Sequence, residues 1–114
     1  MGIQRSILES IEDDWLSDHE IQTDYRAEFS LAATEAFARM VPDLIMWISQ
    51  GLLVPGDMLR GFEAWSGEAS SLSERFAKEA AKILQIERPG QICWFDLGPA
   101  ADSRLREYRG DERH

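Results

Sequence analysis

The first part of the chain has apolar residues at the spacing of a helix. Over residues 3–15 they recur every three or four positions and fall within an arc of about 140°. A stripe of this width is typical of a helix with one face in the core. The sequence therefore predicts a first helix over residues 3–15. Five of its side chains are expected to be buried: Ile3, Ile7, Leu8, Ile11 and Trp15.

A second helix is expected to follow almost at once. Ser17 and Glu20 have the spacing of a capping box, in which the two residues satisfy each other's free backbone N–H groups at a helix start. They predict that the first helix ends near Trp15 and that a new helix begins after Ser17. Three side chains of this short, polar helix are expected to be buried: Ile21, Tyr25 and Phe29.

The third predicted helix covers residues 31–50, with Ser30 as its N-cap and Gly51 as the residue that ends it. It is apolar on most sides, which predicts that it is the central, buried helix. A narrow polar stripe keeps its phase across Pro42, so we expect a kink or two nearly collinear segments there and not a turn. The stripe consists of Glu35, Arg39 and Asp43.

A β-hairpin is expected after Gly51. Residues 52–54 are β-type, and Pro55-Gly56 suits the corner positions of a type II turn. Alternating residues over 61–65 then permit a second strand. The sequence therefore predicts two short strands that reverse at Pro55-Gly56.

One more helix and one more strand are predicted further on. Ser71 and Glu74 form a second capping-box pattern, which opens a helix to about Ile86. Five of its residues are expected to face inward: Leu72, Phe76, Ala80, Ile83 and Leu84. Residues 92–95 are the best strand candidate, and we expect this strand to pair with the hairpin.

Together these elements predict an α+β fold, with a helical N-terminal half packed on a small antiparallel sheet. The helix–helix–hairpin order is also that of a winged-helix domain. Residues 1–100 are expected to form a single domain. Residues 101–114 are expected to be a polar tail, frayed or weakly helical, because residues 102–114 balance four acids against four arginines.

Negative charge is concentrated at the start of the chain. The first 28 residues hold eight carboxylates against two arginines, so they carry −6 of the net charge of −9. Such a field attracts basic protein surfaces and raises association rates, and it repels nucleic acid. A winged-helix DNA binder is disfavoured because it should present a lysine and arginine face. The alternative interpretation is a solvated face that only keeps the protein soluble.

Residues that could carry catalysis or bind a metal lack the partners that they need. His19 and His114 have no second His or Cys at ligand spacing, and no calcium-loop pattern accompanies the acids. No serine has a nucleophile-elbow pattern or a plausible histidine base, and Cys93 lies in an apolar strand segment, where an inert core thiol is expected. We therefore expect no enzyme, no cofactor and no metal site.

The single cysteine is typical of a reducing compartment, and no secretory leader or membrane-spanning run is recognisable. These features predict a cytoplasmic protein that binds neither a membrane nor a nucleic acid.

Four tryptophans is a high number for 114 residues. Trp15 and Trp47 lie on apolar helical faces and are expected in the core. Trp65 and Trp94 flank strand segments, where one of them could be an exposed anchor for a partner, because aromatic residues are enriched at binding hot spots. Burial in a well-packed core is the alternative for each.

Several short motifs occur in a familiar order. They are Asp14-Trp15-Leu16-Ser17, a G-L-x-x-P-G-D segment at 51–57, a G-F-x-x-W segment at 61–65 and a P-G-Q-I-C-W-F segment at 89–95. Over residues 13–98 this order resembles small bacterial immunity-like proteins of polymorphic and contact-dependent toxin systems. The resemblance implies a protein that binds and neutralises a cognate toxin.

With the charge, the resemblance suggests a basic toxin such as a nuclease as the partner, steered by the acids of the first two helices. The predicted contact residues are Glu9, Glu12, Asp13, Asp18, Glu20 and Asp24. The competing hypothesis is a homo-oligomeric structural or regulatory accessory protein with no toxin partner. A small enzyme would need a pocket with titratable groups that the sequence does not display.

Overall fold

The computed structural model describes residues 2–111 of the chain. The five helices and four short strands of these residues are interspersed along the chain. The elements are α1 (Ile3–Asp13), β1 (Leu16–Ser17), α2 (Asp18–Phe29), α3 (Ala33–Ser49), β2 (Leu53–Met58), β3 (Phe62–Ala64), α4 (Ala69–Ala80), β4 (Trp94–Leu97) and α5 (Ala101–Asp111).

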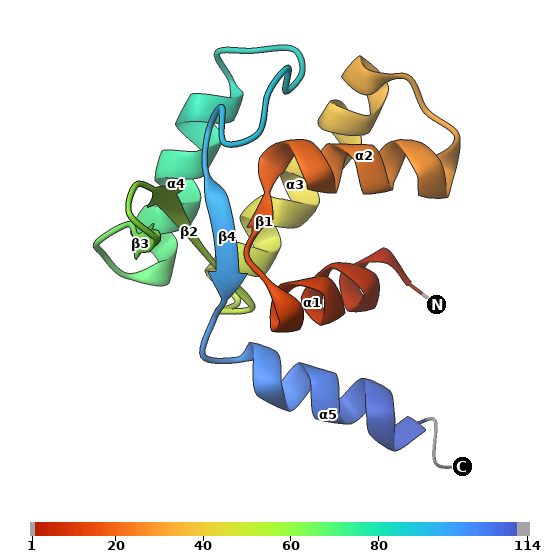
Figure 1. The fold of residues 1–114 in the computed structure, drawn as a ribbon, viewed down its shortest axis with the longest axis vertical. Coiled ribbons are helices and arrows are strands. Elements are labelled where there is room, and N and C mark those ends of the chain that lie inside the picture. Colours follow the sequence, from red (N-terminus) through yellow and green to blue (C-terminus); the bar gives the residue numbers. More distant parts are fainter. Residues whose placement is uncertain (1, 112–114) are drawn as a thin grey trace.

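The four strands form one antiparallel sheet in the order β1-β4-β2-β3 (Figure 1). The late strand β4 is therefore internal. It pairs with β1 through Leu16 and Phe95, and with β2 through Pro55 and the same Phe95. The predicted pairing of this strand with the hairpin is confirmed. The two-residue strand β1 has no counterpart among the predicted strands, because two residues are too few for an alternating pattern.

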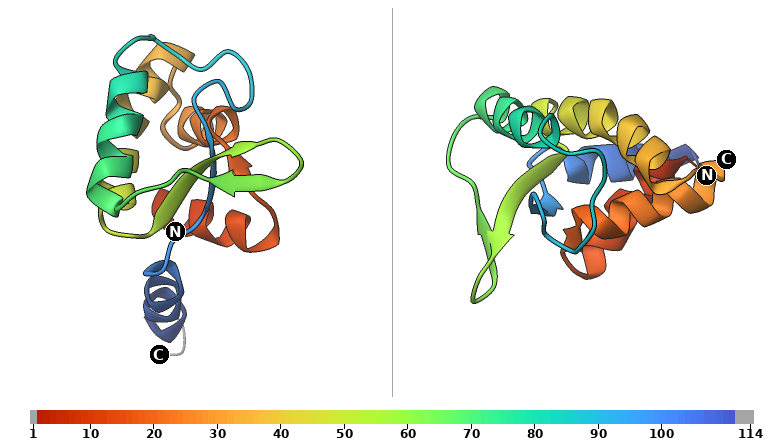
Figure 2. Two further views of the ribbon diagram at one scale, coloured as in Figure 1. Left: turned by 90° about the vertical axis from the view of Figure 1, so that its left-hand side faces the viewer. Right: turned by 90° about the horizontal axis from the view of Figure 1, so that it is seen from above.

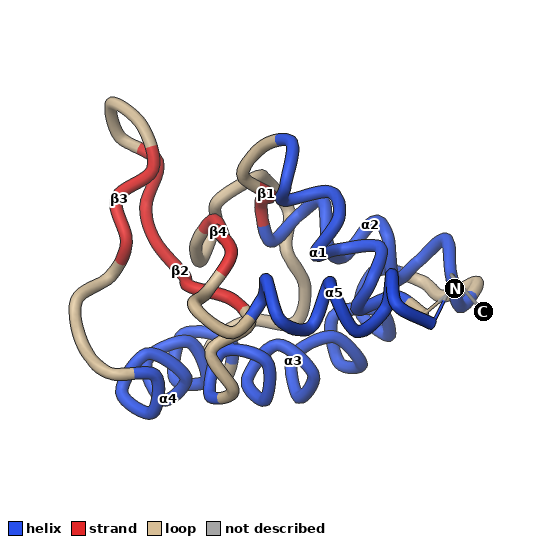
Figure 3. Tube along the Cα trace, turned by 90° about the horizontal axis from the view of Figure 1, so that it is seen from below, coloured by secondary structure: helices blue, strands red, loops and turns tan. Residues whose placement is uncertain are grey.

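The helices surround the sheet unequally. Helices α3 and α4 lie side by side and pack on β2, whereas α1 and α2 lie at the β1 end of the sheet (Figures 1 and 3). The β2–β3 hairpin projects away from the helices (Figure 2). The predicted α+β class is confirmed, with helices in the N-terminal half and a small antiparallel sheet. Among the described residues, no helix is both long and apolar enough to cross a membrane.

Helix α3 is the central helix, as its apolar sequence predicts. It packs against α2, α4 and β2. It runs without a break from Ala33 to Ser49 and contains Pro42, so the prediction that no turn occurs there is confirmed. Its buried side chains are Ala36, Phe37, Met40, Leu44, Trp47 and Ile48.

Two predicted helix boundaries are confirmed by their hydrogen bonds. The Ser17 hydroxyl oxygen accepts a bond from the Glu20 backbone N–H at 3.1 Å, and the same hydroxyl donates to the Glu20 carboxylate at 3.1 Å. At the end of α3, Gly51 has φ of 76° and its N–H donates to Ile48, while the Leu52 N–H donates to Trp47. This is the Schellman arrangement that favours glycine.

Two other predicted caps are wrong. Ser30 does not begin α3; it ends α2 with a left-handed backbone (φ 54°), and α3 begins three residues later, at Ala33. Ser71 lies inside α4, which begins at Ala69, so Ser71 and Glu74 are not a capping box. Serine suits several backbone conformations, so its presence near a boundary does not tell which role it has.

The predicted hairpin is present, but its predicted turn is wrong. Pro55 and Gly56 lie inside β2, where they pair with Phe95 and Trp94 of β4. The chain reverses at residues 59–61 instead, between the paired residues Met58 and Phe62. Proline is tolerated at this position because its nitrogen faces the same side as its carbonyl, which accepts a bond from the Trp65 N–H at 2.9 Å just beyond the end of β3.

Helix α4 ends at Ala80, not near Ile86 as predicted. Residues beyond it form turns and a loop up to β4, and Leu84 is 80% exposed, so its predicted inward position is wrong. Ile86 nevertheless reaches the core. The helical spacing of apolar residues continues past the point at which the chain leaves the helix.

Of the two forms expected for the polar C-terminal segment, frayed or weakly helical, residues 101–111 take the helical one and form helix α5; residues 112–114 lie outside the described residues. Ala101 and Leu105 are buried in the core, and α5 lies alongside α1 (Figure 1). Only a narrow apolar stripe on this polar helix touches the core. Such a stripe produces little helical periodicity in the sequence.

The need for glycine at position 56 can be tested by mutation. A Cβ placed there would lie 2.5 Å from the Glu63 carbonyl oxygen and 2.6 Å from the Phe62 ring. We expect Gly56→Ala to lower the free energy of unfolding by about 1–3 kcal/mol, because backbone and ring must shift to accept it. Gly61→Ala is the matched control, since nothing lies within 4 Å of a Cβ there. Urea denaturation of both variants measures the difference, and equal stabilities would contradict this account.

Candidate functional site

The most prominent surface feature is a groove between α1 and α2, with a volume of about 620 Å³. Four carboxylates and two aromatic side chains line it, together with smaller residues. We call this surface the acidic groove and define it by Asp13, Asp14, Glu20, Asp24, Trp15 and Trp94. The end of α1 supplies the first two acids, α2 supplies Glu20 and Asp24, and Trp94 begins β4.

The charge of the groove has one sign. A smaller hollow of about 270 Å³ continues it along α2, shares Ser10 and Asp24 with it, and adds Glu28. A third hollow on the other side of Trp15 adds Glu12 and Asp96. Among the described residues that line these three hollows, every charged side chain is an acid. The surface therefore favours a cationic partner and disfavours an anionic one.

The helical position of Trp15 predicted that its side chain lies in the core. That prediction is wrong, because Trp15 is 38% exposed. Helix α1 ends at Asp13, and Asp14 has extended backbone angles, so the apolar stripe stops before it reaches Trp15. The Trp15 ring stacks on Phe62 of the projecting hairpin, with ring centres 5.9 Å apart. This contact joins the hairpin to the rim of the acidic groove.

Trp94 reaches the groove from the sheet and is half-buried. Gly90 lies directly beside it, so that a Cβ at Gly90 would collide with the Trp94 indole nitrogen. Gly90 also has φ of 73°, a conformation that favours glycine. The loop before β4 thus packs closely against this ring and helps to fix it. The hypothesis that Trp94 is a surface anchor is compatible with this placement, whereas Trp65 is buried.

The surroundings of Asp24 in the groove affect its protonation. Partial burial, and then the neighbouring charge of Glu20, raise the pKa of the Asp24 carboxyl above its usual value. Both causes penalise the anion. A cation bound in the groove would favour the anion and would reverse that effect.

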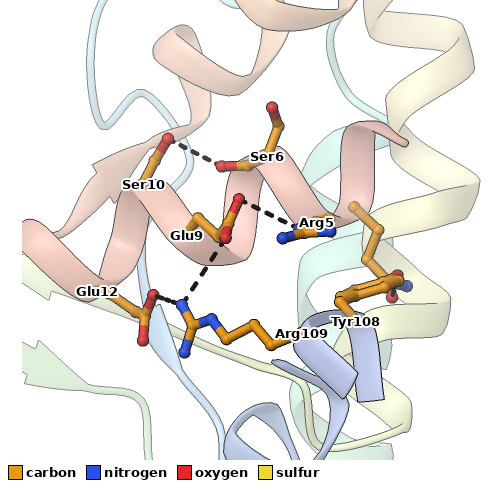
Figure 4. A network of polar contacts seen from close by, with 8 residues as sticks. Arg5, Ser6, Glu9, Ser10, Glu12, Tyr108 and Arg109 are labelled. Atoms are coloured by element: carbon orange, nitrogen blue, oxygen red, sulfur yellow. Dashed lines mark hydrogen bonds and ion pairs between the residues drawn. The ribbon is translucent and has the colours of Figure 1, made fainter. Parts of the chain in front are cut away.

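Glu9 and Glu12, two of the predicted contact residues, lie on the side of α1 that faces α5 (Figure 4). Arg109 of α5 is 3.8 Å from the Glu9 carboxylate and also bonds Glu12. Glu9 pairs with Arg5 as well, at 3.4 Å. These acids therefore hold α5 against α1, and their charge is partly neutralised within the molecule.

Asp18, also a predicted contact residue, is fully buried, so its predicted exposure to a partner is wrong for this conformation. One carboxylate oxygen accepts bonds from the N–H groups of His19 and Gly90, both at 2.8 Å. The other accepts from Ile92 at 2.7 Å and from Cys93 at 3.4 Å. Burial raises the pKa of the Asp18 carboxyl, because desolvation outweighs the four backbone donors, which favour the anion.

The other candidates for chemistry are unremarkable in their geometry. Cys93 is 1% exposed, and burial, then the charge of Asp18, raise the pKa of its thiol, so the predicted core position is confirmed. Within residues 2–111, no three His, Cys, Asp or Glu side chains are grouped closely enough to hold a metal ion.

The structure thus divides the six predicted contact residues into three groups. Asp13, Glu20 and Asp24 meet in one groove, Glu9 and Glu12 pair with Arg109, and Asp18 holds a loop. Asp14 and Trp15 were not among the predicted contact residues, yet both line the acidic groove and the hollow that adds Glu12 and Asp96. The capping box at Ser17 was a signal for the exposed position of Trp15, because a helix that begins after Ser17 requires the chain to leave α1 shortly before it.

Comparisons with known proteins add nothing to this geometry: no protein-family model, no curated protein and no solved structure matches the chain. The resemblance to immunity-like proteins stays a prediction carried by its motifs.

The buried carboxylate of Asp18 can be tested by an isosteric change. Asp18→Asn leaves one acceptor oxygen and turns an NH₂ group toward backbone N–H donors, so we expect a loss of about 1–3 kcal/mol in the free energy of unfolding. Asp13→Asn is the matched control, because Asp13 is exposed, and it should change stability by less than about 0.5 kcal/mol. Thermal and urea unfolding measure both. A loss no greater than that of the control would show that Asp18 does not hold the loop.

Proposed function

We propose that this protein is a non-enzymatic binding protein that neutralises a cognate bacterial toxin, in the manner of an immunity protein. The observation that carries the proposal is the acidic groove, in which four carboxylates surround two tryptophans at a surface with no basic side chain among its described lining residues. The motif resemblance is a second, independent support.

The groove has the two features that a protein interface for a basic partner needs. Its acids steer a cationic surface toward it and raise the association rate, an effect that salt weakens. Trp15 and Trp94 offer flat aromatic area against which the stem of a lysine or the plane of an arginine packs. A basic toxin held in this way would have its own functional surface covered.

The proposal is tested by co-expression with the product of a neighbouring gene, taken as the candidate toxin-like product. A tagged copy of this protein should retain that product in a stoichiometric complex, which dissociates as ionic strength rises, and should relieve its toxicity in cells. If the toxin-like product stays active and unbound, the proposal is wrong. A copy that recovers only itself, as an oligomer on size exclusion, would favour the accessory-protein hypothesis.

Charge reversal in the groove should slow binding. We expect Asp13→Lys combined with Glu20→Lys to lower the association rate by at least about tenfold at low salt and to reduce its dependence on ionic strength, because the steering field is lost. Stopped-flow mixing with the partner measures both effects.

The matched control for this variant is Glu74→Lys combined with Glu107→Lys. These residues are exposed on α4 and α5, away from the groove, and the change in net charge is the same. An equal effect of the two pairs would show that only the total charge matters and that the groove is not the interface.

Binding should also depend on pH through Asp24. Because burial and the charge of Glu20 raise its folded pKa, Asp24 keeps its proton to a higher pH than an ordinary aspartate and gains its charge only as the pH rises through that pKa. Affinity for a basic partner should therefore rise with pH across this range. Asp24→Asn should flatten that rise, as measured by isothermal titration calorimetry at a series of pH values, and an unchanged profile would exclude Asp24 from the interface.

A further inference from the structure

Arg109 is a basic side chain that lies against an acidic surface of the same molecule. Its guanidinium bonds the Glu12 carboxylate and lies 3.8 Å from that of Glu9 (Figure 4). Glu12 also lines the hollow beside Trp15, in which every charged side chain among the described lining residues is an acid. Helix α5 thus places an arginine of this chain at one end of the surface that we propose for a basic partner.

The last turns of α5, which carry this arginine, are held to α1 by polar contacts and by one half-buried ring. The Tyr108 hydroxyl bonds the Gln4 side chain, and the Tyr108 ring is the half-buried one. Among the described residues of α5, the fully buried side chains are those of Ala101 and Leu105, in the first half of the helix. The last turn can therefore separate from α1 while the first half stays packed.

The ion pair of Arg109 with Glu12 is open to solvent. The Arg109 side chain is 40% exposed and the Glu12 side chain 36%. Pairs this exposed contribute little to stability, because water and salt screen both charges. An arginine that approaches from solvent therefore competes with Arg109 for Glu12 on nearly equal terms.

We propose that Arg109 makes an autoinhibitory contact: it occupies the Glu12 end of the acidic surface until an arginine of a basic partner replaces it. This inference rests on the proposed function, because it requires a cationic partner. Once Arg109 leaves, Glu12 adds its charge to those of Asp13 and Asp14, and the acidic surface extends along α1. Partner binding and separation of the last turn of α5 are then coupled, so each favours the other.

The test titrates the ¹⁵N-labelled full chain with acetyl-tetra-arginine amide at low ionic strength. The Arg109 Nε–H signal, identified by its loss in Arg109→Gln, should shift in a saturable way together with the amides of the last turn of α5. Arg109→Gln should bind the peptide about threefold more tightly than Arg106→Gln, because the internal competitor is gone. Arg106→Gln is the matched control: it removes the same charge from α5, but Arg106 pairs with Asp102 of α5 itself, at 3.2 Å.

A double variant separates the loss of a competitor from a change in the folding of α5. Arg109→Gln combined with Glu12→Gln keeps the net charge of the natural chain and should bind the peptide as the natural chain does, since the freed acid is removed as well. Two results would overturn this inference and leave the proposed function standing: equal affinities of Arg109→Gln and Arg106→Gln, or an Arg109 signal that stays unmoved while the groove amides reach saturation. A peptide that shifts the groove amides of none of these chains would overturn both.

Discussion

The structure depends on a buried carboxylate that holds a loop far away in the sequence. Asp18 accepts hydrogen bonds from Gly90, Ile92 and Cys93, and Gln22, one turn later on α2, exchanges two bonds with the backbone of Ile86. One face of α2 thus fixes the irregular segment between α4 and β4 near its middle and at the end that leads into β4. The segment has only a few turn hydrogen bonds of its own, so these two side chains, together with the burial of Ile86 and Cys93, hold it in position.

The same constraint shapes the surface that we propose to be functional. The chain joins the sheet at Leu16 and Ser17, begins α2 through the Ser17 cap, and buries Asp18 at the next residue. This short path brings the end of α1 and the start of α2 together, with their acids facing a common groove. The loop held by Asp18 packs Gly90 against Trp94, which completes the groove from the sheet side. The buried carboxylate of Asp18 therefore helps to position the exposed carboxylates of the acidic groove.

Short sequence patterns predicted the features of the fold that depend on interactions between residues close together in the chain. The Ser17–Glu20 cap, the Gly51 helix end and the absence of a turn at Pro42 are confirmed, and so is the late strand, although it begins at Trp94 and not at Ile92. Pro55-Gly56 was misplaced because pairing with β4 outweighs turn propensity, and α5 was expected only as a frayed or weakly helical tail because it gains its stability by packing on α1. The role of Asp18 could not be predicted from the sequence either, because Gly90 and Ile92 lie more than 70 residues away and no spacing rule connects them to it. Acidic charge indicated the face that we propose to be functional, but not which of its acids are exposed and which are buried or paired within the molecule.

Amide hydrogen exchange of the native protein tests the central claim most directly, because it reports the hydrogen bonds of the loop itself. Gly90 and Ile92 lie outside regular secondary structure, in a segment that would exchange rapidly if only solvent met its N–H groups. Our account predicts that these two amides are protected to a degree comparable with the amides of β4 that bond within the sheet. Exchange at the rate of an open loop would contradict it, and the acidic groove would then lack the support that fixes Trp94.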